Sequence, residues 1–109
     1  MNIKTENIDF LFEKNELIPA VIQDASDSRV LMLAYMNRES LALTIREGRT
    51  WFWSRSRKCL WEKGATLGHF QTVREIYYDC EDNSLLIKVD QTGVPCHTGE
   101  ATCFYRRLV

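Results

Sequence analysis

The amino-acid sequence predicts one α+β domain in which a mostly antiparallel β-sheet carries one or two short helices. The chain has 109 residues, of which 45% are hydrophobic, and this size and composition suit a single compact core. Short β-branched and apolar runs alternate with polar turns along most of the chain, which favours strands over long helices. Since no repeat, low-complexity segment or flexible linker interrupts these runs, we expect residues 1–109 to form one domain.

Five segments have the β-branched, aromatic or apolar character of strands: 17–24, 30–35, 50–54, 72–79 and 84–90. The polar stretch 25–29 separates the first two and predicts a hairpin of two central strands. Asp82 and Asn83 predict a tight turn between the last two strands. Residues 91–99 include one proline and two glycines and are expected to form a loop.

The clearest helix signal follows Asn37. Its side-chain oxygen can accept a hydrogen bond from a backbone N–H two or three residues later, which is the usual start of a helix. Gly48 suits the left-handed conformation that ends one. A second, shorter helix is predicted over residues 5–13, where apolar side chains recur at helical spacing, although an extended start is an alternative there.

The charge is unevenly distributed along the chain, although its formal total is only −1. Residues 46–63 contain six Lys or Arg and two Glu, a balance of +4, whereas residues 75–100 contain one Lys and six Asp or Glu, a balance of −5. A basic half next to an acidic half is what a phosphate-bearing substrate and a metal ion would require. Salt-bridged surfaces give the same pattern, so charge alone leaves both interpretations open.

Composition also argues against several classes of protein. The near-neutral total charge is unfavourable for a nucleic-acid-binding protein, which needs a broad basic face. The apolar stretches are too short to span a membrane. The N-terminal residues lack the continuous hydrophobic region of a secretory signal, so we expect a cytoplasmic protein.

Three of the four cysteines are candidate metal ligands. Cys80, Cys96 and Cys103 lack the CxxC spacing of a zinc ribbon, so a shared metal must be assembled by tertiary or quaternary contacts. Three thiolates leave one position of a tetrahedral zinc ion open, as in catalytic sites, and His97 would then be a nearby acid or base or an outer-shell group. Alternatively, the cysteines are small buried hydrophobic residues and His97 is a loop residue.

Asp79, Glu81 and Asn83 alternate along the chain. If this segment is extended, their oxygens project from one face and the sulfur of Cys80 from the other. Oxygen ligands that carry charge suit Mg²⁺, so one strand could serve two metals. The alternative is a solvated turn of negative character.

The run from Trp51 to Gly64 mixes aromatic rings, hydroxyls and cations, a combination that binds phosphates and stacks on a base. Because the overall charge disfavours nucleic acid, a nucleotide is the more economical ligand. By contrast, His69 and Cys59 have no comparable neighbours in the sequence, and we interpret His69 as an ordinary polar residue. The candidate substrate-binding residues are Ser54, Arg55, Ser56, Arg57, Lys58, Trp61 and Lys63.

Four segments together closely resemble the phosphoribosyl-AMP cyclohydrolase family. They are LIPAVIQDASDSRVLMLAYMN at 17–37, WSRSRKCLWEKG at 53–64, the pair Asp79 and Cys80, and CHTGEATCF at 96–104. They occur in the family's order and extend over nearly the whole chain. The resemblance implies an enzyme that uses water to open the adenine ring of N1-(5-phosphoribosyl)-AMP between N1 and C6, the third step of histidine biosynthesis.

The resemblance also implies the metal sites. Cys80, Cys96 and Cys103 would bind zinc, with each zinc held by cysteines of both subunits of an intertwined homodimer. The family uses Mg²⁺ at a DCDxD motif, which reads DCEDN here, with Glu81 and Asn83 in place of aspartates. The loss of one charge at Asn83 should weaken Mg²⁺ binding. Many relatives carry a second domain after this one, whereas this chain is expected to be monofunctional.

In the enzyme interpretation, His97 moves a proton and the basic run holds the phosphates of the substrate. The competing hypothesis is a zinc-stabilised nucleic-acid-binding module, in which the cysteines are structural and SRSRK contacts backbone phosphates. The lack of a fourth cysteine ligand argues against that module, although His97 could complete a closed site. A thiol redox protein is disfavoured because the sequence contains no CxxC.

Overall fold

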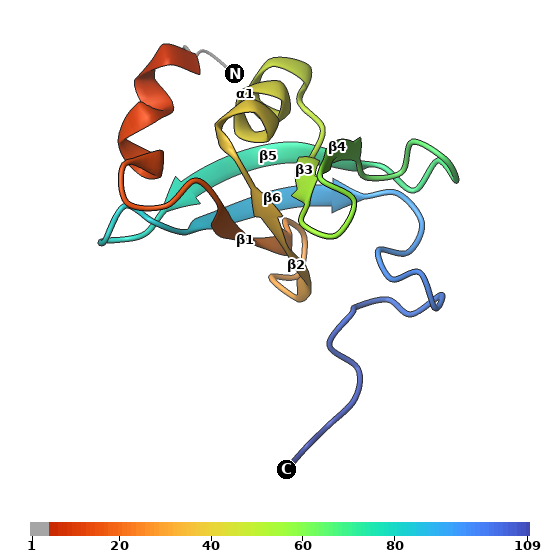
Figure 1. The fold of residues 1–109 in the computed structure, drawn as a ribbon. Coiled ribbons are helices and arrows are strands. Elements are labelled where there is room, and N and C mark those ends of the chain that lie inside the picture. Colours follow the sequence, from red (N-terminus) through yellow and green to blue (C-terminus); the bar gives the residue numbers. More distant parts are fainter. Residues whose placement is uncertain (1–4) are drawn as a thin grey trace.

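The computed structural model describes residues 5–109 and confirms the α+β fold class. A four-stranded sheet has the order β2-β1-β6-β5, and a separate two-stranded sheet is formed by β3 and β4 (Figure 1). The elements in chain order are the 3₁₀ helix η1 (Thr5–Phe12), β1 (Ile18–Asp24), β2 (Val30–Met36), α1 (Arg38–Glu47), β3 (Trp51–Ser54), β4 (Cys59–Glu62), β5 (Gln71–Tyr78) and β6 (Leu85–Gln91).

Two antiparallel hairpins make up the larger sheet, β1 with β2 and β5 with β6. They are joined by a parallel pairing of β1 with β6, in which Ala20 lies opposite Leu85. The predicted hairpin is confirmed, but the prediction that both of its strands are central is wrong, because β2 lies at the edge. Apolar residues indicate that at least one face of a strand is covered, and they carry no information about the neighbours to which its backbone is hydrogen-bonded.

The strand β4 was not anticipated from the sequence. It pairs antiparallel with β3, with Ser54 opposite Cys59, so residues 55–58 form the connecting loop of a short hairpin. The serines and basic residues of this loop dominate the sequence pattern, and the apolar part of β4 is only two residues long, Leu60 and Trp61. The resulting hairpin carries most of the candidate substrate-binding residues.

The hydrophobic core lies between one face of the larger sheet and the two helices (Figure 1). Alternate residues of the two central strands point into it, Ile18, Ala20 and Ile22 from β1 and Leu85, Ile87 and Val89 from β6. The helix η1 contributes Ile8 and Leu11, and α1 contributes Leu41 and Ile45. Among residues 5–109, no helix is long and apolar enough to cross a membrane.

An apolar row crosses the opposite face of this sheet. Leu33, Val21, Leu86 and Tyr77 lie side by side on β2, β1, β6 and β5, because each is paired in register with the next. Leu33 and Tyr77 at the two ends of the row are 43% and 49% exposed. The helices cover only the other face, so this row is a surface on which an apolar partner could pack.

The helix α1 begins as predicted. The Asn37 side chain accepts a hydrogen bond from the Ser40 backbone N–H (2.8 Å), and the Ser40 hydroxyl in turn accepts one from the Asn37 backbone N–H (2.9 Å). Gly48 ends the helix with φ of +72°.

We expect Asn37→Ala to lower the free energy of unfolding by about 1 kcal/mol, because a backbone N–H at the helix start loses its acceptor. Urea denaturation followed by circular dichroism measures this change. Asn37→Asp retains an acceptor oxygen and should remain within about 0.5 kcal/mol of the wild type. Equal losses in both variants would contradict the capping role.

Candidate functional site

The loop of the β3–β4 hairpin is folded by its own serine. The Ser54 hydroxyl accepts the Arg57 backbone N–H (3.2 Å), and the Ser54 carbonyl accepts the N–H of Lys58 (2.8 Å). Lys58 takes a left-handed conformation with φ of +52° and returns the chain into β4. Ser54 therefore shapes the loop as well as lying in the candidate site.

Arg55 anchors this loop to the larger sheet. Its guanidinium lies 3.9 Å from the centre of the Tyr35 ring on β2, which is a favourable cation–π contact. Arg55 and Lys58 do not line either of the cavities described next. The basic run is thus divided by the structure, and Arg57 is the member of the 55–58 loop that carries positive charge to the cavities.

Two adjoining cavities flank β4 and share a wall that includes Arg57, Trp61 and Glu62. The loop cavity, of about 620 Å³, is also lined by Trp51, Ser54, Ser56 and Cys59. The cysteine cavity, of about 580 Å³, is also lined by Lys63, His69, Cys96 and His97. Each volume is within the range of cavities that bind small molecules. Of the predicted site residues, those that line these two cavities are Ser54, Ser56, Arg57, Trp61, Lys63, Cys96 and His97.

Lys63 connects the two walls of the cysteine cavity. Its ammonium group donates a hydrogen bond to the carbonyl of Pro95, the residue before Cys96, and lies 6.0 Å from the centre of the Trp61 ring. This contact holds the end of β4 against the loop that carries Cys96. Lys63 therefore positions the cysteine loop in addition to supplying positive charge.

Cys96 and Cys103 are in contact. The two thiols lie close enough for each to shift the pKa of the other, and the Thr98 hydroxyl lies 2.9 Å from the Cys96 sulfur. The Thr98 hydroxyl lowers the pKa of the Cys96 thiol, whereas partial desolvation of its sulfur and the neighbouring Cys96 raise the pKa of Cys103. The Cys103 backbone N–H donates to the Leu31 carbonyl (2.7 Å), which fixes this segment to the start of β2. Two soft sulfur donors thus converge at one point, as a zinc site requires.

Cys80 lies apart from this pair. It occupies the turn between β5 and β6, at one end of β6, whereas Cys96 follows the other end, about 20 Å away along a strand of this length (Figure 1). Within residues 5–109, no three His, Cys, Asp or Glu side chains gather in a group that could hold a metal. One copy of the chain therefore supplies two of the predicted sulfur ligands at one place and the third at another.

The acidic segment is a turn, so of the two interpretations left open by the sequence the turn is confirmed and the extended strand is not. The strand β5 ends at Tyr78, and the Asp79 Oδ1 atom accepts the backbone N–H groups of Asn83 (2.9 Å) and Ser84 (3.1 Å). These bonds, that from Asn83 above all, lower the pKa of the Asp79 carboxyl. The turn predicted at Asp82 and Asn83 is confirmed, with φ of +56° at Asp82. Alternation along a strand consequently does not place Asp79, Glu81 and Asn83 on one face.

His69 is the cavity residue that the sequence analysis missed. It lies between β4 and β5, is half-buried, and lines the cysteine cavity together with His97. Its neighbours in sequence gave no sign of this, because the residue against which its ring packs, Gly93, comes from the loop after β6. The one available signal was composition, since the chain has only two histidines.

The chain is similar to known proteins over its whole length. Residues 32–105 match the family model described as phosphoribosyl-AMP cyclohydrolase. The phosphoribosyl-AMP cyclohydrolase of Clostridium botulinum (strain Kyoto / Type A2) is 54% identical over 110 residues, which covers 100% of both chains. That of Lacticaseibacillus casei is 60% identical over 92 residues, or 84% of each chain. A bifunctional histidine biosynthesis protein of Thermosynechococcus vestitus is 56% identical over 96 residues, which are 87% of this chain and 45% of that protein. On these matches, the chain belongs to the phosphoribosyl-AMP cyclohydrolase family.

Proposed function

We propose that this chain hydrolyses N1-(5-phosphoribosyl)-AMP by opening its adenine ring between N1 and C6, as a step of histidine biosynthesis. The observation that carries the proposal is that the basic hairpin and the Cys96–His97 segment border two adjoining cavities in a member of this family. A nucleic-acid-binding module is less well supported, because the chain has a formal net charge of only −1 and only Arg57 and Lys63 among the predicted basic residues line the cavities.

The hairpin supplies the groups for the nucleotide. Trp61, half-buried between the cavities, offers an aromatic face to a base, and Arg57 with Ser56 offers charge-assisted hydrogen bonds to a phosphate. Lys58, exposed on the same loop, adds positive charge to the hairpin. Arg55 acts through its stacking on Tyr35, which holds the loop in place.

A zinc ion would be held by Cys96 and Cys103 of one chain and by Cys80 of the partner subunit. The paired thiols and the soft character of sulfur fit this metal, and the distance of Cys80 from them requires a second copy. Bound zinc would lower the pKa of a coordinated water so that hydroxide is available near neutral pH. The contact with the Thr98 hydroxyl lowers the pKa of the Cys96 thiol, which favours the thiolate form that binds metal.

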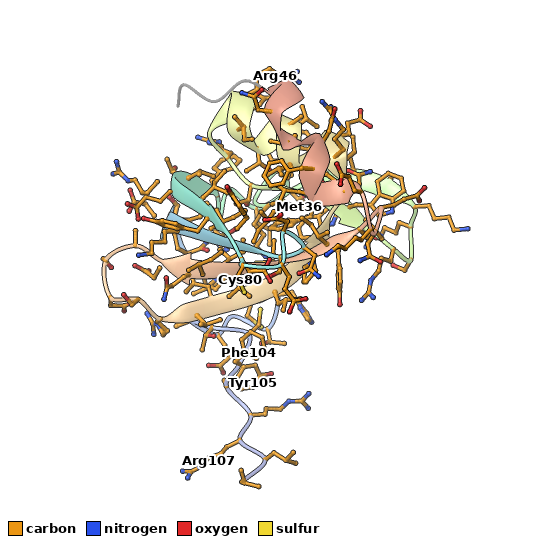
Figure 2. All side chains as sticks on the ribbon, turned by 90° about the vertical axis from the view of Figure 1, so that its left-hand side faces the viewer. Met36, Arg46, Cys80, Phe104, Tyr105 and Arg107 are labelled. Atoms are coloured by element: carbon orange, nitrogen blue, oxygen red, sulfur yellow. The ribbon has the colours of Figure 1, made fainter. Side chains whose placement is uncertain are left out.

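Two surfaces support a homodimer. The apolar row on the outer face of the larger sheet is one. The other is the tail 104–109, which leaves the body of the protein, with Phe104, Tyr105 and Arg107 seen below it in Figure 2. Phe104 is 60% exposed and Leu108 is 97% exposed, which is costly for apolar side chains in water. A second copy would cover these side chains and bring the missing Cys80, which gives an intertwined arrangement.

The acidic turn supplies oxygen donors for Mg²⁺ through Asp79, Glu81 and Asn83. Because the Asp79 Oδ1 atom already accepts two backbone N–H groups, the turn offers fewer free oxygens than three carboxylates would. Mg²⁺ commonly completes its coordination with substrate phosphates and water. We therefore expect Mg²⁺ to bind here together with the nucleotide rather than alone.

The direct test uses the purified chain and phosphoribosyl-AMP, with ring opening followed by ultraviolet absorbance and the product identified by mass spectrometry. The expected product contains one added water. Activity should disappear after treatment with a chelator and return with zinc. A full-length, folded protein that leaves the substrate unchanged with both metals present would overturn the proposal.

His97 would accept the proton released by the attacking water, since it lines the cysteine cavity next to Cys96. We expect His97→Asn to lower kcat by roughly 10²–10⁴-fold, because proton transfer is lost while the thiols remain. Steady-state kinetics and zinc analysis of the same preparation measure both quantities. A variant that loses its zinc would identify His97 as a ligand, and one that retains both zinc and rate would remove it from the mechanism.

A further inference from the structure

Both histidines of the chain line the same cavity. His69 and His97 lie on the wall of the cysteine cavity, one from the segment before β5 and the other from the loop after β6. The other charged side chains that line it are Arg57, Glu62 and Lys63. Imidazole is the side chain that both gains and loses a proton near neutral pH, whereas arginine, glutamate and lysine ordinarily keep one protonation state there.

The His69 ring is held by a glycine. A Cβ atom built on Gly93 would lie 2.6 Å from Cδ2, 2.8 Å from Cγ and 3.0 Å from Nε2 of His69, so the ring packs directly against the Gly93 backbone. Gly93 also has φ of +71°, which disfavours any other residue. The ring therefore occupies a place that only a glycine at this position leaves open.

The backbone of His69 is fixed from two further sides. The Gln91 side-chain amide donates to the His69 carbonyl (3.3 Å), and its oxygen accepts from the buried Gln71 amide (2.9 Å). Gln71 in turn accepts a hydrogen bond from the buried Thr50 hydroxyl (2.8 Å). On the other side, Gly64 approaches the backbone so closely that a Cβ there would lie 2.6 Å from the His69 carbonyl carbon.

This scaffold fixes the backbone of His69, and the residue also lines the cysteine cavity. Within residues 5–109, the hydrogen bond of His69 to protein runs through its carbonyl oxygen, and its ring makes none. A structural histidine normally uses a ring nitrogen for a protein partner when it is partly buried. The ring of His69 is thus positioned rigidly while its hydrogen-bonding groups remain for a bound molecule.

Ring opening requires two proton transfers. The water oxygen forms a bond to C6, the electron pair of the N1–C6 bond passes to N1, and the exocyclic nitrogen stays on C6 as the amide. One proton of the water ends on N1, and for the cationic N1-substituted ring the other is released. In the proposed function, His97 accepts a proton from the attacking water. Cleavage of the N1–C6 bond needs a separate group that donates a proton to N1.

We propose that His69 is this second group: it delivers to N1 the proton that N1 gains as the bond to C6 breaks. The inference rests on the proposed function. It assigns the two imidazoles of the cavity to the two ends of the breaking bond, with His97 on the side of Cys96 and His69 on the side of Gly93.

His69→Gln is the direct test, because glutamine retains a hydrogen-bonding amide near the place of Nε2 but cannot transfer a proton. We expect kcat to fall by roughly 10²–10⁴-fold while KM, zinc content and the melting temperature stay close to the wild type. Wild-type kcat in a folded His69→Gln protein would overturn the inference alone. An inactive wild type would overturn the proposed function and this inference with it.

A pair of glycine variants tests the same inference if His69→Gln does not fold. Gly93→Ala displaces the His69 ring, whereas Gly48→Ala places alanine at nearly the same φ with nothing within 4 Å of its Cβ. We expect Gly93→Ala to lower kcat and Gly48→Ala to leave it unchanged. In a His69→Ala background, Gly93→Ala should have no further effect on kcat. Equal kcat in the two glycine variants, or independent effects in the double variant, would contradict the role of His69.

Discussion

Cys96→Ser should abolish both zinc binding and ring opening. Cys96 is buried, is in contact with Cys103, and has its pKa lowered by the Thr98 hydroxyl, so it is the sulfur best prepared to bind metal. A serine hydroxyl remains protonated near neutral pH and is a poor zinc ligand. Zinc content should fall from about one equivalent per chain to near zero, and activity should fall below detection. Elemental analysis and the absorbance assay measure the two losses.

Cys59→Ser provides the matched control for this result. Cys59 is also a free cysteine, but it lies at the start of β4 and has no other cysteine beside it. The same substitution there should leave the zinc content unchanged. Full zinc in Cys96→Ser, or loss of zinc in both variants, would contradict the assignment of Cys96 as a ligand.

Mixing two inactive variants should restore activity if the zinc site is shared. A heterodimer of Cys80→Ser and Cys103→Ser chains has one site with all three sulfurs, because the intact Cys80 of one chain meets Cys96 and Cys103 of the other. Random exchange of subunits would place heterodimers in half of the population, so about one quarter of the wild-type activity is expected. Activity after co-refolding measures the recovery, and native mass spectrometry measures the fraction of heterodimer.

The control mixture combines Cys96→Ser with Cys103→Ser. Both residues lie in the same half of the site, so no heterodimer of these two variants has an intact set of sulfurs. This mixture should remain inactive. Recovery in both mixtures, or in neither when heterodimers are present, would show that the ligands are not divided between subunits as proposed.

The elements that the sequence predicted correctly are those determined by neighbouring residues. Asn37 and Gly48 delimit α1 because capping involves residues within one turn of the helix. The β1–β2 hairpin is likewise specified by two apolar runs and the turn between them. Asp79 is a further example, since its side chain forms the turn predicted at Asp82 and Asn83 by accepting the backbone N–H groups of Asn83 and Ser84.

What the sequence could not predict depends on residues that are distant in the chain. The pairing of Ala20 with Leu85 follows from how two hairpins pack, and no residue pattern near either strand encodes it. The place of His69 depends on Gly93, which approaches it from the loop after β6. The cysteine, histidine and hairpin residues could be named as candidates because their chemical types are distinctive, whereas their division between two cavities required the three-dimensional arrangement.

The parallel pairing of β1 with β6 also affects the order in which the strands can pair during synthesis. During synthesis β2 follows β1 at once, but the other edge of β1 has no partner until β6 is made. Closing such a long loop costs chain entropy and slows folding, so the docking of the two hairpins is expected to be the slow step. Until then the nascent chain exposes an apolar strand edge, which is the part of this fold most open to aggregation or to a chaperone.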